Sequence, residues 1–285
     1  MDIEKIKKVQ KIQLFMMGQI HDVCEKYGIK YYLIGGSALG AVRHKGIIPW
    51  DIDIDIAMMR ENYDKFVEDV CKYLPVFLEC NYWKKTNNYK PPHAVISLKD
   101  SVITLTDHYL NADLPVSSIS IDLFPIDYCP ETTKLQEKQA NKIKHLKSLK
   151  GRKLGRVKAG EKGIKVFTKQ VVRLLLSPIS IRTINKLLDK EMRRYDNGCN
   201  KQFVCSMASH YSYSKQCMPY DIYGKPILLV FENQQFYVPN QVHEYLKRIY
   251  GDYNKLPSEE EKLVQINYFS DASWPEWINQ ELVRL

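Results

Sequence analysis

Apolar residues recur every three or four positions between residues 3 and 27, with Lys and Glu between them. This spacing predicts an amphipathic helix, and Gly28 is placed to end it. The next segment, residues 30–34, reads KYYLI, and its aromatic and aliphatic side chains predict a strand. A short helix is then expected over residues 39–43.

An alternating run occupies residues 51–56, where Asp51, Asp53 and Asp55 alternate with isoleucine. A period of two predicts a strand with the three acids on one face and the isoleucines facing the core. Apolar spacing predicts a helix over residues 61–73. Helices that alternate with strands predict an α/β or α+β sheet domain. Further strands are expected at residues 93–98, 101–106 and 118–124.

The second half of the chain is dominated by helical patterns. One covers residues 134–176 and is loosened by four glycines between Gly151 and Gly163, and another covers residues 182–195. The tail is expected to form two short strands and a helix, at residues 226–231, 235–239 and 243–250. The region 130–165 is the best candidate for a domain boundary.

The composition is that of a folded protein. The chain has 285 residues, 45% hydrophobic and 26% charged, and a chain of this length can bury a sizeable core without disulfides or structural metal. Seven cysteines, none spaced CxxC, predict a reducing compartment. The N-terminus lacks the pattern of a signal peptide, and no run approaches the roughly 18 apolar residues that a membrane span needs. We therefore expect a cytoplasmic location.

Positive charge is concentrated in one segment. Residues 134–173 contain fourteen Lys and Arg against two Glu, so this segment is more positive than the net +9 of the whole chain. It suggests a membrane surface or a polyanion as partner. In the predicted helix 164–176, Lys165, Lys169 and Arg173 lie opposite an apolar face. Two interpretations stay open: peripheral contact with an anionic membrane at the inner face of the cell, or a packed helix with a solvated basic face.

The chemistry is expected at the acidic run. The side chains of Asp51, Asp53 and Asp55 would stand about 6.6 Å apart on one strand face, from a rise of about 3.3 Å per residue. Without a cation, the like charges repel and raise one another's pKa. Mg²⁺ or Mn²⁺, which prefer oxygen ligands, explain this row better than packing does. The alternative is a solvent-exposed strand face that is acidic without function.

Gly35-Gly36-Ser37 stands between a predicted strand and a predicted short helix. Glycine lets backbone N–H groups approach a phosphate, a helix N-terminus favours an anion, and Ser37 adds a hydroxyl donor. This turn and the paired acids are what phosphoryl or nucleotidyl transfer requires. Asp122, on the polar face of a later strand, is the expected third carboxylate. It completes the metal site, acts as base toward a hydroxyl, or is a plain strand-end acid.

The stretch from Tyr32 to Ile56, YLIGGSALGAVRHKGIIPWDIDIDI, resembles the core motif of the LicD family. That family comprises phosphocholine transferases and the fukutin-related ribitol-phosphate transferases. Two later pieces also match, IDLFPID at residues 121–127 and YGDY with LP within residues 250–257. The resemblance extends from residue 5 to 262 and is thin only across the basic segment. It implies an α+β fold, with a nucleotidyltransferase-like mixed β-sheet core flanked by helices and a basic helical insertion.

The resemblance also implies an organisation and a set of site residues. Residues 1–130 would form the catalytic core, 131–200 the basic helical insertion and 201–285 the C-terminal part of the catalytic domain. The implied catalytic carboxylates and metal ligands are Asp53, Asp55 and Asp122. The implied contacts to the donor phosphates are Gly35, Gly36 and Ser37, with Arg43, His44 and Lys45 neutralising phosphate charge. Additional candidates are Trp50, Asp51 and Lys99.

Two departures from the family pattern affect the expected contacts. Members often carry acids where this chain has Ile34 and Ile52, so contacts to the donor headgroup or to the acceptor need not be the usual ones. Asp127 is interpreted as a turn cap. A choline headgroup would require an aromatic box, for which the candidates are Trp83, Tyr109, Tyr211 and Tyr213.

The expected reaction is transfer of a phospho-alcohol headgroup. CDP-choline or a related CDP-alcohol would bind on the glycine turn. A hydroxyl of a saccharide acceptor, either free or lipid-linked, would attack the phosphorus and release CMP. The headgroup is open between choline, ethanolamine, ribitol and glycerol. One rival is a nucleotidyltransferase that adds NMP to a small molecule and releases pyrophosphate. A second is a polyanion-binding protein, but the basic segment has no recognised RNA-binding motif, so no nucleic-acid partner is expected.

Overall fold

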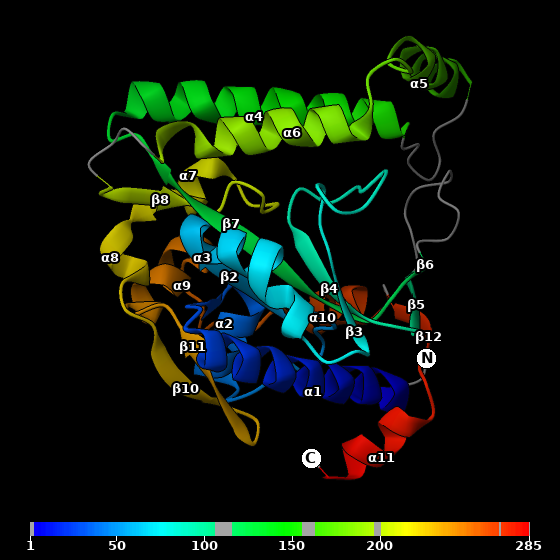
Figure 1. The fold of residues 1–285 in the computed structure, drawn as a ribbon, viewed down its shortest axis with the longest axis vertical. Coiled ribbons are helices and arrows are strands. Elements are labelled where there is room, and N and C mark those ends of the chain that lie inside the picture. The colour runs from blue at the N-terminus through cyan, green and yellow to red at the C-terminus, as the bar shows by residue number, and fades with distance from the viewer. Residues whose placement is uncertain (1–2, 106–115, 156–162, 197–200, 268, 285) are drawn as a thin grey trace.

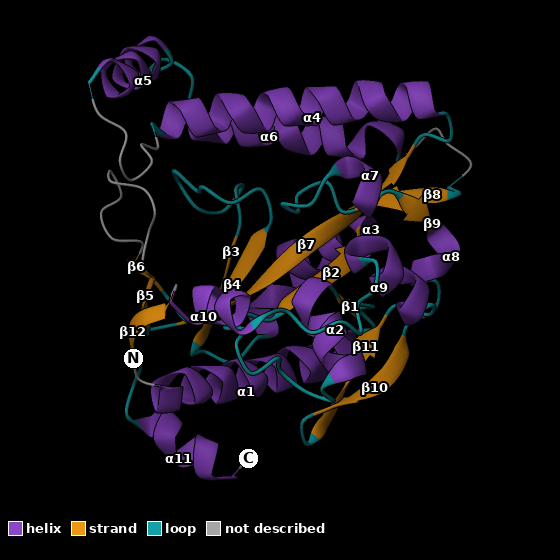
Figure 2. Ribbon diagram, turned by 180° about the vertical axis from the view of Figure 1, so that it is seen from behind, coloured by secondary structure: helices purple, strands orange, loops and turns teal. Residues whose placement is uncertain are grey.

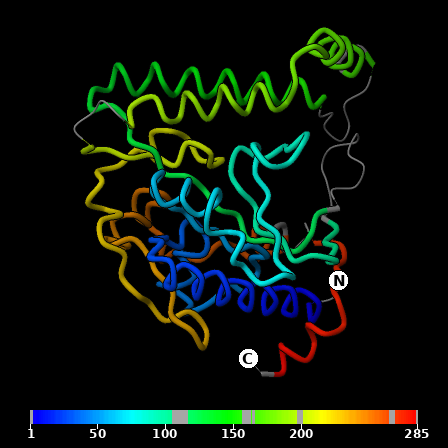
Figure 3. The backbone as a smooth tube through the Cα atoms, in the orientation of Figure 1, coloured from blue at the N-terminus to red at the C-terminus, as the bar shows by residue number. Residues whose placement is uncertain are grey.

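The computed structural model describes residues 3–105, 116–155, 163–196, 201–267 and 269–284. Figure 1 shows a mixed sheet in the middle of the molecule, with helices α4 (Thr133–Leu154) and α6 (Ile181–Met192) side by side above it and α1 (Ile3–Tyr27) below. Figure 2 shows the same layers from behind, and Figure 3 follows the backbone between them. The predicted α+β class, a mixed sheet flanked by helices, is confirmed.

The main sheet has the strand order β1–β2–β7–β4–β3, and the second half of β7 also pairs with β8, which pairs with β9. Strands β2 and β7 run parallel, whereas β4 and β8 are antiparallel to β7. The bounds are β1 (Tyr32–Leu33), β2 (Asp55–Met59), β3 (Leu78–Asn81), β4 (Ala94–Leu98), β7 (Ser120–Cys129), β8 (Phe203–Cys205) and β9 (Met218–Pro219). The central strands bury apolar side chains such as Ile56, Ile96 and Leu123, which form the middle of the core.

Two smaller sheets flank the main one. The strands β5 (Val102–Leu105), β6 (Val116–Ser117) and β12 (Phe269–Ser273) form a three-stranded sheet, and β10 (Ile227–Phe231) pairs with β11 (Gln234–Val238) as a hairpin. The short and C-terminal helices are α7 (Tyr213–Gln216), α8 (Tyr220–Tyr223), α9 (Val242–Tyr250), α10 (Glu259–Asn267) and α11 (Trp277–Arg284).

Helix α1 buries its apolar stripe and also holds the acidic run in place. Its predicted bounds are confirmed, and Gly28 ends it with a φ of 65°. The side-chain amide of Gln10 donates to the Asp51 carbonyl at 2.6 Å, and that of Gln13 donates to the Ile52 carbonyl at 2.9 Å. These bonds replace the strand pairing that the acidic run would otherwise need.

The strand predicted at residues 51–56 is therefore displaced. Strand β2 begins only at Asp55 and continues to Met59, while residues 51–54 lie outside the ladder. The prediction erred because the carbonyls of Asp51 and Ile52 are satisfied by glutamine side chains of α1, an interaction that strand periodicity does not reveal. Ile54 is nevertheless buried, as the alternation requires.

Two further predictions need correction. The helix expected at 61–73 is α3 (Arg60–Lys65) followed by a π-helical turn at Phe66–Val70 and a 3₁₀ turn at Cys71–Tyr73. Asp127 does not cap a turn: it lies inside β7, fully buried, and accepts two hydrogen bonds from the Arg60 guanidinium at 2.6 and 2.8 Å. A buried carboxylate requires such a partner.

The basic segment forms helices, as predicted. Helices α4 and α6 pack together, and α5 (Ile164–Leu175) follows α4 and stands apart from the sheet in Figures 1 and 2. Helix α6 continues into a 3₁₀ turn at Arg193–Tyr195. No helix among the described residues is both long and apolar enough to cross a bilayer.

Candidate active site

Two chambers border the same acidic residues. The larger, of about 1170 Å³, lies between the polar face of the sheet and helix α4, and we call it the sheet chamber. The smaller, of about 620 Å³, lies beside helix α2 (Gly35–Arg43), and we call it the tyrosine chamber because it is lined by Tyr211, Tyr250 and Tyr253. Asp53, Asp55 and His210 line both chambers, so the acids stand where the two meet.

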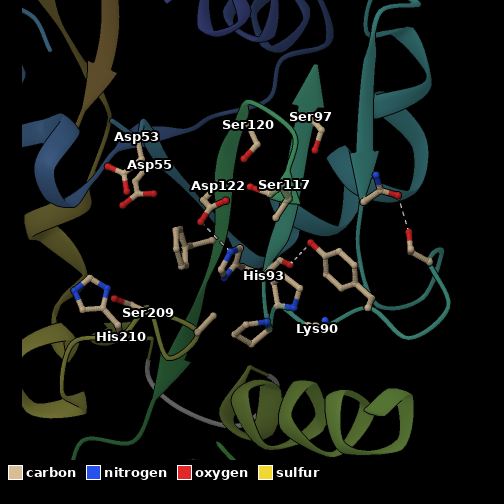
Figure 4. A pocket seen from close by; sticks show the side chains of 18 of the residues that line it. Asp53, Asp55, Lys90, His93, Ser97, Ser117, Ser120, Asp122, Ser209 and His210 are labelled. Carbon is tan, nitrogen blue, oxygen red and sulfur yellow. Dashed lines mark hydrogen bonds and ion pairs between the residues drawn. The ribbon is translucent and has the colours of Figure 1, made fainter. Parts of the chain in front are cut away.

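Asp55 and Asp122 are brought together by the parallel strand pair. Asp55 is the first residue of β2, and its register partner on β7 is Asp122. Asp53 precedes β2 by two residues and lines the same two chambers as Asp55. Figure 4 shows the carboxyl groups of these three residues on one side of the sheet chamber. The predicted grouping of the three acids is present in the fold.

The glycine turn is the first turn of helix α2, which begins at Gly35, four residues earlier than predicted. Gly35 has a φ of 54°, a conformation that glycine adopts without strain, and its N–H donates to the Tyr245 hydroxyl at 2.9 Å. A Cβ on Gly36 would lie 2.5 Å from Oδ2 of Asp51, so only glycine fits beside that carboxyl group. Gly36 borders the tyrosine chamber and opens the helix N-terminus onto it.

Ser37 acts on the acids rather than facing the chambers. Its side chain is buried, and its hydroxyl oxygen accepts a hydrogen bond of 2.8 Å from the backbone N–H of Asp55. The Ile34 N–H, in turn, donates to the Asp55 carbonyl at 3.0 Å. The glycine turn therefore fixes the start of strand β2 and with it the direction of the Asp55 side chain.

Crowding of the carboxylates disfavours their charged forms. Desolvation and the neighbouring Asp53 raise the pKa of Asp51 well above its usual value. Desolvation, followed by repulsion from Asp53 and Asp122, does the same to the pKa of Asp55. The Asp53 pKa is also raised, chiefly by desolvation, although a hydrogen bond from Asp51 opposes the rise. The Asp53 side chain is exposed to the solvent of the chamber. The surrounding protein nevertheless displaces part of its hydration shell, which is why desolvation raises its pKa.

These acids fit a hard divalent cation by their chemistry. Carboxylate oxygens are the preferred ligands of Mg²⁺ and Mn²⁺, and a bound cation removes the repulsion that raises their pKa values. Within the described part of the chain, no three such side chains already close around a single point. Asp53 and Asp55, with Asp122 across from them, would hold the ion.

Two histidines that sequence reasoning missed lie beside the acids. Nε2 of His93 is 3.1 Å from Oδ2 of Asp122, and His210 lies close enough to Asp53 to oppose the rise in the pKa of that carboxyl group. Desolvation lowers the pKa of His210 itself, against the opposing effect of Asp53. The available signal for His93 was its position as the first residue of the strand predicted at residues 93–98. His210 sits in a loop with no such signal.

The tyrosine chamber gathers aromatic and charged side chains. Trp50 and Arg43 line it, and the Arg43 guanidinium donates to the Tyr253 carbonyl at 2.8 Å. The Tyr211 hydroxyl donates to the Tyr250 hydroxyl at 2.9 Å, and their rings meet edge to face. Of the predicted aromatic candidates that the structure describes, Trp83, Tyr211 and Tyr213, only Tyr211 lines this chamber.

Several predicted residues lie elsewhere. His44 packs its ring against Trp50 rather than lining either chamber, and Lys45 borders a separate small cavity near His243. Lys99 donates to the Val76 carbonyl at 2.6 Å. The Tyr213 hydroxyl donates to Gln139, the Trp83 ring lies under Lys84, and Tyr109 is outside the described residues.

Fold and site together are compatible with an α+β domain of the nucleotidyltransferase type, with a helix-starting glycine turn beside paired acids. The family model described as LicD/FKTN/FKRP, nucleotidyltransferase domain, matches residues 28–93. This match contains the glycine turn, the acidic run and His93, and it confirms the predicted resemblance to the LicD family.

Individual relatives agree with this assignment. The chain is 29% identical over 274 residues to the lipopolysaccharide cholinephosphotransferase LicD of Haemophilus influenzae, which covers 90% of this chain and 94% of that protein. It is 52% identical over 40 residues to the human ribitol 5-phosphate transferase FKRP, covering 14% of this chain and 8% of FKRP. An uncharacterised protein of Rickettsia typhi is 38% identical over 84 residues, 29% of this chain and 26% of that one.

Proposed function

We propose that this chain is a metal-dependent phosphotransferase that moves phosphocholine from CDP-choline to a sugar hydroxyl and releases CMP. The acceptor would be a cell-surface glycan or its lipid-linked precursor. The observation that carries the proposal is similarity along 90% of the chain to a cholinephosphotransferase, combined with paired acids at the junction of two chambers. Two chambers that meet at one acidic point suit a reaction between two substrates.

The chemistry of the linings supports a different substrate in each chamber. The tyrosine chamber contains Gly36, at the N-terminus of helix α2, and Arg43, so it suits the donor diphosphate. The sheet chamber is lined by side chains that exchange hydrogen bonds with sugar hydroxyls, and it is large enough for a saccharide. These side chains include Asn81, Thr86, Ser97, Ser117 and Ser120.

The residues of the chain would orient the reactants and accept a proton. Asp53 and Asp55 would hold Mg²⁺ or Mn²⁺, which supplies charge neutralisation of the transferring phosphoryl group. Asp122 faces the sheet chamber, where an acceptor hydroxyl would lie, so its carboxylate either accepts the hydroxyl proton or completes the metal site. Gly36 and Arg43 would hold the leaving CMP on the opposite side.

The headgroup would be recognised by aromatic rings. Trp50, Tyr211, Tyr250 and Tyr253 line the tyrosine chamber together with Asp252, and both ring faces and carboxylates attract a quaternary ammonium group. The local similarity to a ribitol 5-phosphate transferase supports CDP-ribitol as a second donor to test, and phosphoethanolamine and glycerol phosphate share the same chemistry. A nucleotidyltransferase would use the same acids but release pyrophosphate.

Peripheral contact with an anionic membrane through residues 164–176 is also proposed. Helix α5 exposes Phe167, Leu174 and Leu175 at 65%, 71% and 73%, so this apolar face is not packed against the described protein. Lys169 and Arg173 lie on the same helix. A lipid-linked acceptor would then reach the sheet chamber, which α4 borders through Lys147, Lys150 and Leu154.

A donor screen tests the proposal. The full chain is incubated with Mg²⁺, a saccharide acceptor extract and either CDP-choline, CDP-ethanolamine, CDP-ribitol, CDP-glycerol or an NTP, and the products are separated by anion exchange. We expect CMP from CDP-choline only when acceptor is present, and no CMP from Asp53→Asn. Pyrophosphate release from an NTP in place of CMP would establish the nucleotidyltransferase alternative. Metal-independent CMP release would refute the role given to the acids.

A further inference from the structure

We propose that His93 is a positioning residue that fixes Asp122 in the orientation needed to bind the divalent cation or the acceptor hydroxyl. This inference rests on the proposed function, because it concerns the third carboxylate of the same site. His93 lies at the edge of the sheet chamber, and Figure 4 shows its ring directed toward Asp122.

The sheet register places His93 where it can reach Asp122. His93 immediately precedes β4, which runs antiparallel to β7 with Val95 opposite Asp122 and Ala94 opposite Leu123. One position further along, His93 stands across from Phe124, whose side chain shares a face of β7 with Asp122. The ring centroids of His93 and Phe124 are 4.2 Å apart, which leaves Nε2 beside the carboxyl group of Asp122.

The backbone of His93 is held from several sides. Pro91 and Pro92 precede it, and the ring of each proline fixes its own φ, which stiffens the chain leading into His93. The Tyr89 hydroxyl donates to the His93 carbonyl at 3.0 Å, and the Tyr89 carbonyl accepts from the Asn185 side chain on α6 at 2.7 Å. The helical insertion thereby anchors the loop that carries the histidine.

Nε2 of His93 and Oδ2 of Asp122 are 3.1 Å apart, which is within ion-pair distance. An ionised carboxylate can only accept a proton, so Nε2–H of His93 would be the donor in this contact. Nδ1 is buried and has no hydrogen-bond partner among the described residues. With Oδ2 occupied, Oδ1 of Asp122 is the oxygen left for a cation or a substrate proton. Removal of a side chain that orients a metal-binding carboxylate commonly weakens metal binding by about 10–100-fold.

Binding of Mn²⁺ alone separates positioning from packing. His93→Phe keeps a ring against Phe124 but removes Nε2–H, and electron paramagnetic resonance measures free Mn²⁺ in titrations of the full chain. We expect about 10-fold or greater weakening of Mn²⁺ binding, and partial recovery in His93→Gln, whose side-chain amide can donate. His145→Phe is the matched control, because His145 is exposed on α4 and lines neither chamber.

The outcomes distinguish this inference from the proposed function. If wild type and His93→Phe bind Mn²⁺ equally, the positioning role is overturned while metal dependence stands. If wild type binds no Mn²⁺ and transfers no headgroup, the proposed function fails and His93 loses its role with it. Should His93→Phe fail to fold, Phe124→Leu gives the second comparison: it removes the ring contact but keeps the imidazole of His93 beside Asp122. We then expect Mn²⁺ affinity within about twofold of wild type, and a loss as large as that expected for His93→Phe would assign the effect to packing.

Discussion

The hydroxyl oxygen of Ser37 accepts a hydrogen bond of 2.8 Å from the backbone N–H of Asp55. This bond connects the first turn of helix α2 to the first residue of β2, so one contact positions the glycine turn relative to the Asp55 carboxyl group. The serine of the glycine turn therefore orients an acid.

Replacement of Ser37 by alanine should weaken both stability and transfer. The change leaves the N–H of Asp55 without its partner, and a buried unsatisfied donor costs about 1–3 kcal/mol. Urea unfolding monitored by circular dichroism measures the loss, with Ser148→Ala, an exposed serine on α4, as control. Unchanged unfolding midpoints in Ser37→Ala would show that the Asp55 N–H finds another acceptor.

The raised pKa values of Asp51, Asp53 and Asp55 predict how stability depends on pH in the metal-free protein. Because the folded state holds these protons to higher pH than the unfolded chain, folding stability should fall as pH rises from the usual aspartate value of 3.8 through the raised values. Added Mn²⁺ should reverse the trend, because the cation binds the ionised carboxylates.

Thermal denaturation with EDTA and with Mn²⁺ measures this effect between pH 4.5 and 8. We expect the stabilisation by Mn²⁺ to grow with pH, reaching about 2.7 kcal/mol when the ion is present at 100 times its dissociation constant. Asp53→Asn should abolish transfer yet raise the stability of the metal-free protein at neutral pH, since it removes one repelling charge. A variant less stable than wild type at neutral pH in EDTA would contradict the repulsion argument.

Gly36 and Asp51 form a second coupled pair. Alanine is normally favoured over glycine in a helix by about 1 kcal/mol, but a Cβ at Gly36 would meet Oδ2 of Asp51 at 2.5 Å. Gly36→Ala should therefore displace Asp51 and reduce transfer. A double-mutant cycle with Asp51→Ala tests the clash, because removal of the carboxyl group should turn the same substitution from destabilising to neutral or stabilising. Additive effects on the free energy of unfolding would show that the two sites are independent.

Features of the fold that depend on neighbouring residues could be predicted from the sequence, whereas features that depend on contacts between distant residues could not. The bounds of helix α1 and the proximity of Asp53 and Asp55 to each other could be predicted, because both follow from the spacing of residues close together in the sequence. The true start of β2 could not be predicted, because it depends on Gln10 and Gln13 of α1 satisfying the carbonyls of Asp51 and Ile52. His93 was missed for a similar reason: its pairing with Asp122 follows from the register of β4 on β7.

The ion pair between Asp127 and Arg60 is another contact between distant residues that the sequence pattern did not reveal. It leads to a prediction about stability. The Arg60 side chain is 7% exposed and that of Asp127 is 0% exposed, and Asp189 also contacts the guanidinium at 3.2 Å. Removal of one partner leaves a buried charge unpaired, which costs about 3–5 kcal/mol. Arg60→Met should therefore destabilise the fold severely, as measured by urea unfolding. The double variant Arg60→Met/Asp127→Leu should recover part of that loss, and no recovery would indicate that Arg60 acts mainly through Asp189.

The exposed apolar face of α5 predicts binding to anionic lipid. Phe167 and Leu174 are 65% and 71% exposed, and Arg173 lies beside them on the same helix. Burial of both side chains in the interface of a membrane would remove apolar surface from water, and nearby Lys and Arg contribute about 1 kcal/mol each toward an anionic surface. Flotation with vesicles of phosphatidylglycerol and phosphatidylcholine, against phosphatidylcholine alone, measures this binding at low and high salt.

The double variant Phe167→Gln/Leu174→Gln should lose flotation while it retains transfer to a water-soluble acceptor, because neither residue lines a chamber. The matched control is Val76→Gln, an apolar residue exposed at 84% outside the basic segment. Salt should weaken wild-type binding, since the lysine and arginine contribution is screened over about 8–10 Å at physiological ionic strength. Equal flotation of wild type and the double variant would exclude α5 as the contact surface, because the apolar face would then contribute nothing to membrane binding.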